Sequence, residues 1–440
     1  MRTSKKITLK NNQDFRQKLL QWAQQFEEVV WLDSNNYKDR HSRYDAILAV
    51  EAFTAIQTDH DNAFSQLQEY QELTADWIFG YLSYDLKNDT EELVSENHDG
   101  LHFPDLYFFQ PKKLFLLKDD ELEIQYLRMA DDEMEDDLEE IKNTSENDIF
   151  EAPSSEIKPQ IKARLSPDIY LEKVKKMQWH IQRGDIYEAN FCQEFYAENA
   201  ILDPLQTFQS LNKISNPPFA TFLKLHRNYL FSASPERYLK KEGQNIISQP
   251  IKGTARRSKD LAEDEQLRKD LEQDPKERSE NIMIVDLVRN DLSKIAKKGS
   301  VLVEELCKVY TFEQVHQMIS TVKAELEDGI PVMEVLRSTF PMGSMTGAPK
   351  ISAMKIIEEL EESKRGLYSG AVGYFSPQQD FDFNVIIRSI LYSEEHNYAS
   401  FSVGGAITAK SIPQKEYEEC LVKAGAMREV LEKHLKKSSL

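Results

Sequence analysis

Three apolar segments that follow one another near the C-terminal end constrain the fold of this chain most. They cover residues 367–375, 383–392 and 398–407, and short turn-like segments separate them. Apolar runs of strand length joined by short turns predict neighbouring antiparallel strands, because a parallel connection needs a crossover of roughly a dozen residues or more. Helical patterns occupy other parts of the chain, so the sequence predicts an α+β sandwich of helices and mostly antiparallel strands.

The first third of the chain mixes strand-like and helical segments. Strand-like runs cover residues 29–32 and 46–50, and the aromatic segment 77–84 contains a glycine that would let another backbone approach closely. The acidic segment 131–148 predicts an exposed linker or excursion, because its charge is clustered and its apolar content is low. We therefore expect an N-terminal region over residues 1–150.

A second region is expected over residues 165–435. Ser166 and Pro167 begin a helical pattern that Gly184 ends, since serine caps a helix N-terminus and glycine suits the left-handed cap. Further strands and helices are predicted at residues 229–233, 246–251 and 277–292, and from 411–413 onward.

The composition argues against several classes of protein. The 440 residues carry a formal net charge of -20 without any basic block, which disfavours nucleic acid and anionic membrane surfaces as partners. The three cysteines, Cys192, Cys307 and Cys420, form no CxxC pair, so neither a disulfide framework nor a zinc site is indicated. A signal-peptide pattern and a membrane-spanning apolar run are also lacking, and we expect a cytoplasmic protein.

Lys252 and Glu236 are the candidate reactive residues. Lys252 precedes a glycine in PIKGT, and a desolvated, uncharged amine can act as a covalent nucleophile. Glu236 lies just upstream in SPER, and a buried carboxylic acid can protonate a leaving hydroxyl. Together they favour displacement of a poor leaving group on a small organic substrate. The alternative for such a lysine is a plain ion pair or a side chain that only reaches for solvent.

Two carboxylate patterns indicate a metal site. Glu277 and Glu280 are three residues apart in one predicted helix, and Glu416 and Glu419 in another, so each pair lies on one helix face. In an acidic chain such pairs are often surface charge. A hard cation is the functional alternative, and Mg²⁺ fits because it binds one or two carboxylates and completes its octahedron with water and substrate oxygens.

Candidate anion-binding groups lie in further segments. Residues 341–350 form a Gly- and Pro-rich loop that enters a helix, where exposed amides favour anions. Arg388 lies in an otherwise apolar run and needs either a carboxylate ligand or a structural ion pair. Residues 404–406 allow close backbone approach, and Tyr374 and His316 can donate hydrogen bonds.

Eight short motifs occur in the order found in one known family. They are GDIYEANF (184–191), SPER (234–237), PIKGTARR (250–257), ENIMIVDLVRNDL (280–292), MGSMTGAPK (342–350), SGAVGYF (369–375), NVIIRS (384–389) and GGAIT (404–408). They resemble the chorismate-utilising enzymes, which include anthranilate synthase component I, aminodeoxychorismate synthase component I, isochorismate synthase and salicylate synthase. The resemblance implies two largely antiparallel sheets packed in a sandwich with helices outside. HSRYD (41–45) and WIFGYLSYDL (77–86) resemble the N-terminal part of the aminodeoxychorismate synthase members.

The resemblance implies a role for each candidate residue. Glu280 and Glu419 match direct Mg²⁺ ligands, whereas Glu277 and Glu416 match neighbours that act through metal-bound water. A divalent ion there would offset the repulsion between four carboxylates and dianionic chorismate. The expected substrate contacts are His316 at the ring hydroxyl, Arg388 and Tyr374 at the pyruvyl carboxylate, and Thr254, Thr346, Gly347, Gly404, Gly405 and Ala406 at the ring end.

Lys252 distinguishes members of the family. The anthranilate synthase pattern has Ala at this position, whereas the aminodeoxychorismate synthase pattern has Lys. The resemblance implies that Lys252 attacks ring carbon C2 of chorismate while Glu236 protonates the departing C4 hydroxyl. Ammonia then adds at C4, and loss of Lys252 gives 4-amino-4-deoxychorismate for 4-aminobenzoate and folate biosynthesis. Where water-adding members carry Lys and aminodeoxychorismate synthases commonly carry Gln, this chain has Glu188.

The sequence leaves alternative functions open and predicts a partner subunit and a possible tryptophan ligand. Anthranilate synthase component I is the nearest alternative, and a catalytically silent chorismate- or tryptophan-binding protein is the other. No cysteine has the GxCxG setting of a glutamine amidotransferase, so ammonia is expected from a separate glutaminase subunit in a heterodimer. Related enzymes bind tryptophan between N-terminal strands. Ser34 and Asn190 match such positions, with a polar pair in the core as the competing explanation.

Overall fold

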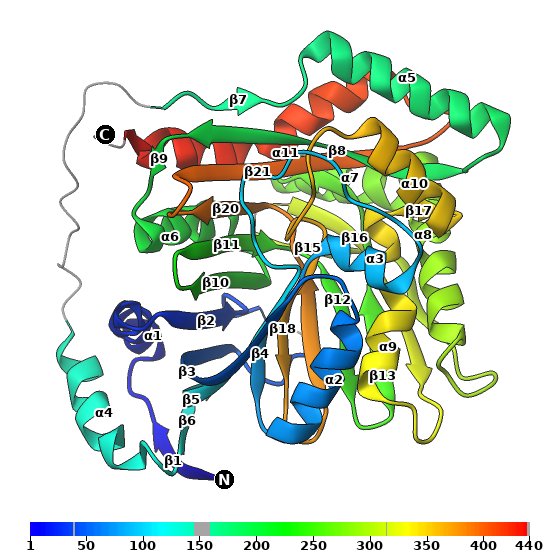
Figure 1. Cartoon of the computed structure of the whole chain (residues 1–440). Helices are drawn as coiled ribbons and strands as arrows, with labels where there is room; N and C mark the ends of the chain where they lie inside the picture. Colours follow the sequence, from blue (N-terminus) through cyan, green and yellow to red (C-terminus); the bar gives the residue numbers. More distant parts are fainter. Residues whose placement is uncertain (38–39, 145–158, 314, 438–440) are drawn as a thin grey trace.

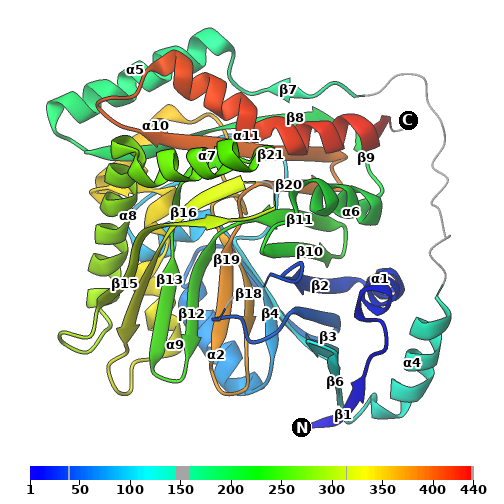
Figure 2. The same cartoon turned by 180° about the vertical axis from the view of Figure 1, so that it is seen from behind.

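The computed structural model describes residues 1–37, 40–144, 159–313 and 315–437. Twenty strands form one hydrogen-bonded network, and the pairings along it are antiparallel. The network folds into two layers whose strands run across one another, with helices on the outside (Figures 1 and 2). The predicted α+β sandwich is therefore confirmed.

One strand, β5, belongs to both layers. β3 pairs along one side of β5, while β4 pairs with its first residues and β6 with its last. The first layer contains, in spatial order, β8 (Glu188–Glu198), β21 (Tyr398–Ile407), β20 (Ser389–Ser393), β11 (Asn228–Ser234), β10 (Phe219–Leu225), β2 (Glu28–Asp33), β3 (Ala46–Thr58) and β5 (Leu106–Lys118). The second layer continues from β5 through β4 (Ile78–Leu82), β18 (Ala371–Phe375), β19 (Phe381–Val385), β12 (Arg237–Glu242), β13 (Asn245–Gln249), β16 (Val315–Glu325) and β15 (Leu302–Thr311), with β14 (Ile251–Arg256) also on β16.

Shorter elements complete the architecture. The remaining strands are β1 (Arg2–Thr8), β6 (Glu121–Leu127), β7 (Lys162–Ala163), β9 (Ala200–Ile201), β17 (Gly347–Ala348) and β22 (Lys436–Lys437). The helices are α1 (Asn12–Trp22), α2 (Ala63–Thr74), α3 (Lys87–Thr90), α4 (Met134–Asn143), α5 (Pro167–Arg183), α6 (Pro204–Ser215), α7 (Leu261–Gln273), α8 (Pro275–Ser293), α9 (Val332–Thr339), α10 (Lys350–Leu360) and α11 (Pro413–His434). Single 3₁₀ turns are η1 (Ala23–Gln25), η2 (Tyr84–Leu86), η3 (Asp131–Glu133) and η4 (Gly343–Met345). Within the described residues, no helix is both long and apolar enough to cross a bilayer.

Alternate residues of the strands serve different cores. Val30 and Ile47 point into the cluster between the two layers, whereas their neighbours Trp31 and Leu48 join the outer cluster of the first layer. Helices α5, α6, α10 and α11 cover that outer face, and α2, α8 and α9 cover the outer face of the second layer. Burial on both faces explains why these strands appear as nearly continuous apolar runs in the sequence.

Two local predictions are confirmed by backbone geometry. Gly80 pairs with Gly373 on one side and Phe108 on the other, and a Cβ on Gly80 would lie 1.9 Å from the carbonyl oxygen of Tyr107. The Ser166 side chain accepts a hydrogen bond from the backbone N–H of Ile169 at the start of α5. Gly184 ends α5 in the left-handed conformation, with φ of 87°.

The acidic segment after residue 130 differs from its prediction as an exposed linker. Part of it forms α4, which buries Met134, Leu138 and Ile141 and packs against α1. These residues recur at helical spacing, but the acidic side chains between them concealed the pattern. The rest of the predicted segment, residues 145–148, lies outside the described residues.

The predicted strand over residues 383–392 is two strands. β19 belongs to the second layer and β20 to the first, and Arg388 lies in the crossing between them with φ of 53°. A left-handed backbone at an arginine ends the strand, because few residues other than glycine and asparagine adopt it readily. Arg388 is therefore at a corner between the layers and not within a strand.

Candidate active site

The two carboxylate pairs come together from different helices. Glu277 and Glu280 lie on α8, and Glu416 and Glu419 on α11. The Nζ atom of Lys276 lies 3.7 Å from Glu280 Oε1 and 3.7 Å from Glu416 Oε1, so it lies between the two pairs. Burial, followed by the charge of Glu280, raises the pKa of Glu277. The structure thus gathers the four carboxylates that the sequence singled out.

Glycines bring two backbone segments close to these carboxylates. A Cβ on Gly405 would lie 3.7 Å from Glu416 Oε2 and 3.9 Å from Glu419 Oε1. A Cβ on Gly253, which has φ of 97°, would lie 3.2 Å from Glu277 Oε2. Strand β21 therefore passes one pair, and the bulged start of β14 passes the other.

Lys252 lies among carboxyl groups. Its Nζ is 3.9 Å from Glu188 Oε1, and its side chain is 14% exposed. Burial raises the pKa values of Glu236 and Glu280, and the positive charge of Lys252 opposes both increases. The same charge helps to lower the pKa of Glu419. The candidate nucleophile, acid and metal ligands consequently occupy one site.

Glu236 has the environment of an acid that keeps its proton to a higher pH than an ordinary glutamic acid. Burial raises its pKa to about 7, against a smaller opposing contribution from its hydrogen bond with Ser344. The hydroxyl of Ser344 donates to Glu236 Oε1 over 2.6 Å. Sequence reasoning missed Ser344, although it lies in the loop 341–350 that was assigned to anion binding.

Glu188 is a second buried carboxyl group near Lys252. Only 2% of its side chain is exposed, and burial raises its pKa. Among the described residues, none donates a hydrogen bond to its Oε2. A buried carboxylate oxygen without a donor is costly, so a ligand or a proton is needed to satisfy it.

Tyr368, rather than Tyr374, accompanies Arg388. Burial lowers the pKa of Arg388, and Tyr368 and then Glu419 are the groups that oppose this effect. Within the described part of the chain, no side chain forms a hydrogen bond or ion pair with the Arg388 guanidinium. The structural ion pair considered for Arg388 is therefore not formed. A partly buried cation beside a tyrosine hydroxyl suits a carboxylate ligand.

Tyr374 and Ser34 line a separate small cavity between the layers. Its volume is about 60 Å³, and Tyr374 packs there against Trp77 and Phe79. Arg388 does not line this cavity, and the pairing of Tyr374 with Arg388 at a ligand carboxylate stays a prediction. Asn190 does not line this cavity. It lies on β8 opposite Ala406, and its backbone N–H donates to Thr346 over 2.8 Å.

His316 is held inside the protein. Its Nδ1 lies 3.0 Å from the Thr311 hydroxyl and its Nε2 lies 3.1 Å from Asp264 Oδ1, and the side chain is 1% exposed. Asp264 lies on α7 and also binds Arg257. Both ring nitrogens thus have protein partners and His316 attaches α7 to β16, while its contact with the ring hydroxyl stays a prediction.

The predicted ring-end contacts lie in three places. Thr346 and Gly347 are buried, and Gly347 pairs with Ala189 so closely that a Cβ would lie 2.2 Å from the Glu188 carbonyl oxygen. Gly404, like its neighbours Gly405 and Ala406, lies on β21 against β8, where a Cβ would lie 2.4 Å from Cys192 Sγ. Thr254 is exposed, beyond the bulge at Gly253.

The glutamate cluster fits a hard divalent cation. All of its donors are carboxylates, and Glu280 Oε1 is buried without a hydrogen-bond donor among the described residues. Direct ligation by Glu280 and Glu419, with water completing the shell, matches the usual Mg²⁺ site. The group therefore meets the chemical requirements of the predicted ion.

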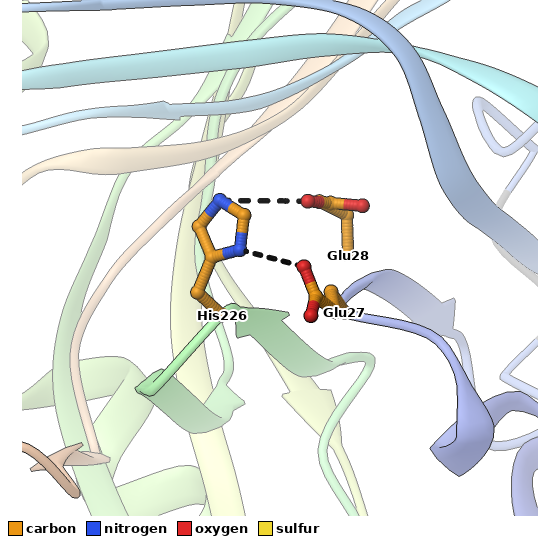
Figure 3. A group of neighbouring side chains, drawn as sticks. All are labelled: Glu27, Glu28 and His226. Carbon is orange, nitrogen blue, oxygen red and sulfur yellow. Dashed lines mark hydrogen bonds and ion pairs between the residues drawn. The ribbon is translucent and has the colours of Figure 1, made fainter.

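Among the described residues, the group whose ligand atoms lie within reach of a single ion is a different one, and no three of the four glutamates meet the same distance. Glu27, Glu28 and His226 offer ligand atoms within 4.8 Å of one another (Figure 3). The two nitrogens of the His226 ring face the two carboxylates, at 3.3 Å from Glu27 and 3.5 Å from Glu28. Glu27 and His226 are exposed, so an ordinary surface ion pair accounts for this group.

Arg365 connects the elements behind the site. Its guanidinium makes two hydrogen bonds to Glu361, one to the Met345 carbonyl over 2.7 Å and one to the Asn190 carbonyl over 2.7 Å. Glu361 also accepts from the backbone N–H of Cys192, whose thiol lies 3.5 Å from the Tyr368 hydroxyl. This buried pair thus positions both β8 and the loop that carries Ser344.

The fold and the site together define an α+β enzyme that places acid, amine and carboxylate groups around an anion-binding corner. Comparison with known proteins identifies the family. The chorismate binding enzyme family matches residues 7–429, and the chain belongs to it. It is a chorismate-utilising enzyme.

Several relatives are similar over most of the chain. Aminodeoxychorismate synthase component 1 of Bacillus subtilis is 31% identical over 395 residues, covering 86% of this chain and 80% of the relative. Anthranilate synthase component 1 of Aquifex aeolicus is 31% identical over 369 residues, covering 81% and 74%. The crystal structure of anthranilate synthase component I from Streptococcus pneumoniae superposes with a TM-score of 0.77 at 26% identity, covering 89% of this chain and 96% of that one.

Proposed function

We propose that the protein is the synthetic subunit of an aminodeoxychorismate synthase. It would convert chorismate and ammonia into 4-amino-4-deoxychorismate, with ammonia supplied by a separate glutaminase subunit. The observation that carries the proposal is the position of Lys252, whose amine lies 3.9 Å from Glu188 and close to Glu236, Glu280 and Glu419.

The charges of the site support a dianionic substrate. The partly buried Arg388, with Tyr368 beside it, suits the pyruvyl carboxylate. The ring carboxylate would face the glutamates, which repel it unless a cation intervenes. Mg²⁺ held by Glu280 and Glu419 would supply that opposite charge when bound.

The reaction would proceed in two substitutions on one ring. Lys252 forms a bond to C2 as the C4 hydroxyl leaves, and Glu236 provides the proton that turns this hydroxyl into water. Ammonia then bonds to C4 as the C2–nitrogen bond breaks. The electron pair of that bond leaves with the Lys252 amine nitrogen. The net change is hydroxyl replaced by amine, with chorismate and ammonia giving product and water.

Anthranilate synthase component I is the second candidate, because relatives with that name match the chain to a comparable extent. Lys252 favours the first candidate, since the anthranilate pattern has Ala at this position. Incubation with chorismate, Mg²⁺ and ammonium, followed by mass spectrometry of the product, tests the proposal. A product that retains its enolpyruvyl group and gains nitrogen is expected. Anthranilate fluorescence without an added lyase would contradict it.

Lys252→Ala should lose most of this product while chorismate still binds. The reason is that binding rests on Arg388 and the cation, whereas substitution rests on the amine. The rate of product formation and equilibrium binding of chorismate measure the two separately. Unchanged turnover in Lys252→Ala would remove this residue from the mechanism.

A further inference from the structure

We propose that Lys276 is a tethered cation that fills the space between the two carboxylate pairs and has to leave it before a divalent cation binds. The inference rests on the cation site of the proposed function, but not on the identity of the reaction. It assigns Lys276 a role in selecting divalent over monovalent ions.

The position of Lys276 is central and weakly fixed. Its Nζ is 3.7 Å from Glu280 Oε1, one turn along α8, and 3.7 Å from Glu416 Oε1 on α11. Both distances are those of ion pairs and are too long for hydrogen bonds. No hydrogen bond of this ammonium is formed with any described residue. Its side chain is 43% exposed, whereas those of Glu280 and Glu416 are 10% and 5% exposed.

The second lysine of the cluster is anchored differently. Lys423 lies 2.7 Å from Glu419 Oε1 and also donates to the Gly404 carbonyl over 3.0 Å. That backbone contact fixes Lys423 in place. Lys276, in contrast, can swing toward solvent without losing a hydrogen bond, so it is the cation that an incoming ion would displace.

The local electrostatics explain why Lys276 enters the cluster at all. It lies in the first turn of α8, where the helix dipole disfavours a positive charge. Glu280 and Glu416 compensate for this, and Lys276 in turn reduces the repulsion between the two pairs. Without an ion, the ammonium therefore holds α8 and α11 together at this point.

Exchange of this charge makes the site selective. A monovalent ion offers the carboxylates no more charge than the ammonium that it replaces, so the exchange gains little binding free energy. A divalent ion doubles the charge and can gain enough to offset the displacement. Lys276 thus lowers the apparent affinity for every cation but excludes monovalent ions most effectively.

Calorimetric titration of the full chain with Mg²⁺ alone, without chorismate, tests this inference. Lys276→Met should bind Mg²⁺ about tenfold more tightly than the unmodified protein, since one competing half-exposed charge is removed. Its Mg²⁺ binding should also weaken more when Na⁺ is raised. Lys276→Gln provides a second, polar variant, and Glu280→Gln should lose the binding if the heat comes from this site.

Lys269→Met is the matched control. Lys269 forms an exposed ion pair with Glu265 on α7, at the same spacing of four residues. It should leave Mg²⁺ binding unchanged. Equal or weaker Mg²⁺ binding in both Lys276 variants would overturn the inference, as would absence of Mg²⁺ binding by the unmodified protein. Because no substrate is present, these outcomes are independent of which product the enzyme forms.

Discussion

At the scale of single residues, burial separates the roles of the carboxyl groups around Lys252. Burial raises the pKa of Glu236 to about 7, which suits a proton donor. Burial also acts on Glu419, but the charge and hydrogen bond of Lys423, together with the charges of Lys276 and Lys252, outweigh it and lower the pKa of that residue. Glu419 therefore stays ionised, as a metal ligand requires.

Glu236→Gln should abolish a pH limb near neutrality. If protonated Glu236 assists departure of the hydroxyl, kcat of the unmodified protein falls as pH rises through about 7. The variant should be about 10²–10⁴-fold slower and lack this limb. Measuring kcat from about pH 5.5 to about pH 8.5 with saturating chorismate tests this prediction. The range covers about one and a half pH units on either side of the expected pKa. An unchanged limb in Glu236→Gln would assign it to another group.

The same shift predicts a change in stability with pH. The pKa of Glu236 is raised in the folded state, so its contribution is fully present below the ordinary value of 4.5 and is lost as pH rises through about 7. The difference in unfolding free energy between the unmodified protein and Glu236→Gln should change by about 3 kcal/mol across this window. Urea unfolding at pH 4.5 and pH 8 measures it, and a constant difference would show that the carboxyl group is not desolvated.

Residue types and motifs located Lys252, Glu236 and the glutamate pairs, because each signal lies within a few neighbouring positions. Ser344 and Tyr368 were missed for a different reason. Their importance depends on the direction of a side chain in a loop, and the sequence does not contain that direction. Tyr374 was chosen over Tyr368, although Tyr368 is the tyrosine that acts on the pKa of Arg388.

At the scale of elements, one buried ion pair sets the position of several segments. Arg365 joins Glu361, just after α10, to the backbone of β8 and of η4. Those segments carry Glu188 and Ser344, which contact Lys252 and Glu236 respectively. Their geometry therefore depends on a residue that does not face the substrate site.

Arg365→Met should destabilise the fold by about 3–5 kcal/mol, because it removes the buried cation that pairs with the Glu361 carboxylate and donates to two backbone carbonyls. Chemical denaturation measures this change. Arg268→Met is the control, since Arg268 forms exposed ion pairs on α7 that are worth about 0–1 kcal/mol. Similar losses in the two variants would mean that the Arg365 pair has no special structural role.

Elements with strong periodicity or clear caps were predicted well, as α5 and α11 show. The predictions of two other segments failed for physical reasons. In α4, clustered acidic residues concealed the spacing of its three buried side chains. At Arg388, an apolar run continues through a left-handed backbone corner, and nothing in the apolar pattern marks the change of layer.

At the scale of the whole molecule, the N-terminal region is part of both layers. β4 pairs with β18, and β2 pairs with β10. The cluster between the layers also takes side chains from β2, β3, β4 and β5. The long-range pairing could not be deduced from the sequence, because apolar patterns identify strands but not their neighbours.

A chain that begins at residue 165 should therefore fail to fold cooperatively. It exposes the edges of β10 and β18 and loses much of the cluster between the layers. Thermal unfolding followed by near-ultraviolet circular dichroism tests this. Co-expression of residues 1–144 with residues 159–440 should restore the transition, and a cooperative transition in the shortened chain alone would contradict the prediction.

The central claim is that the Lys252 amine becomes covalently bonded to the ring of chorismate. Intact-protein mass spectrometry after mixing with chorismate and Mg²⁺, in the absence of ammonia, tests it most directly. The account predicts an adduct of chorismate less one water, located on Lys252 by peptide mapping and discharged when ammonium is added. Aminated product formed at full rate with no adduct on Lys252 would contradict it.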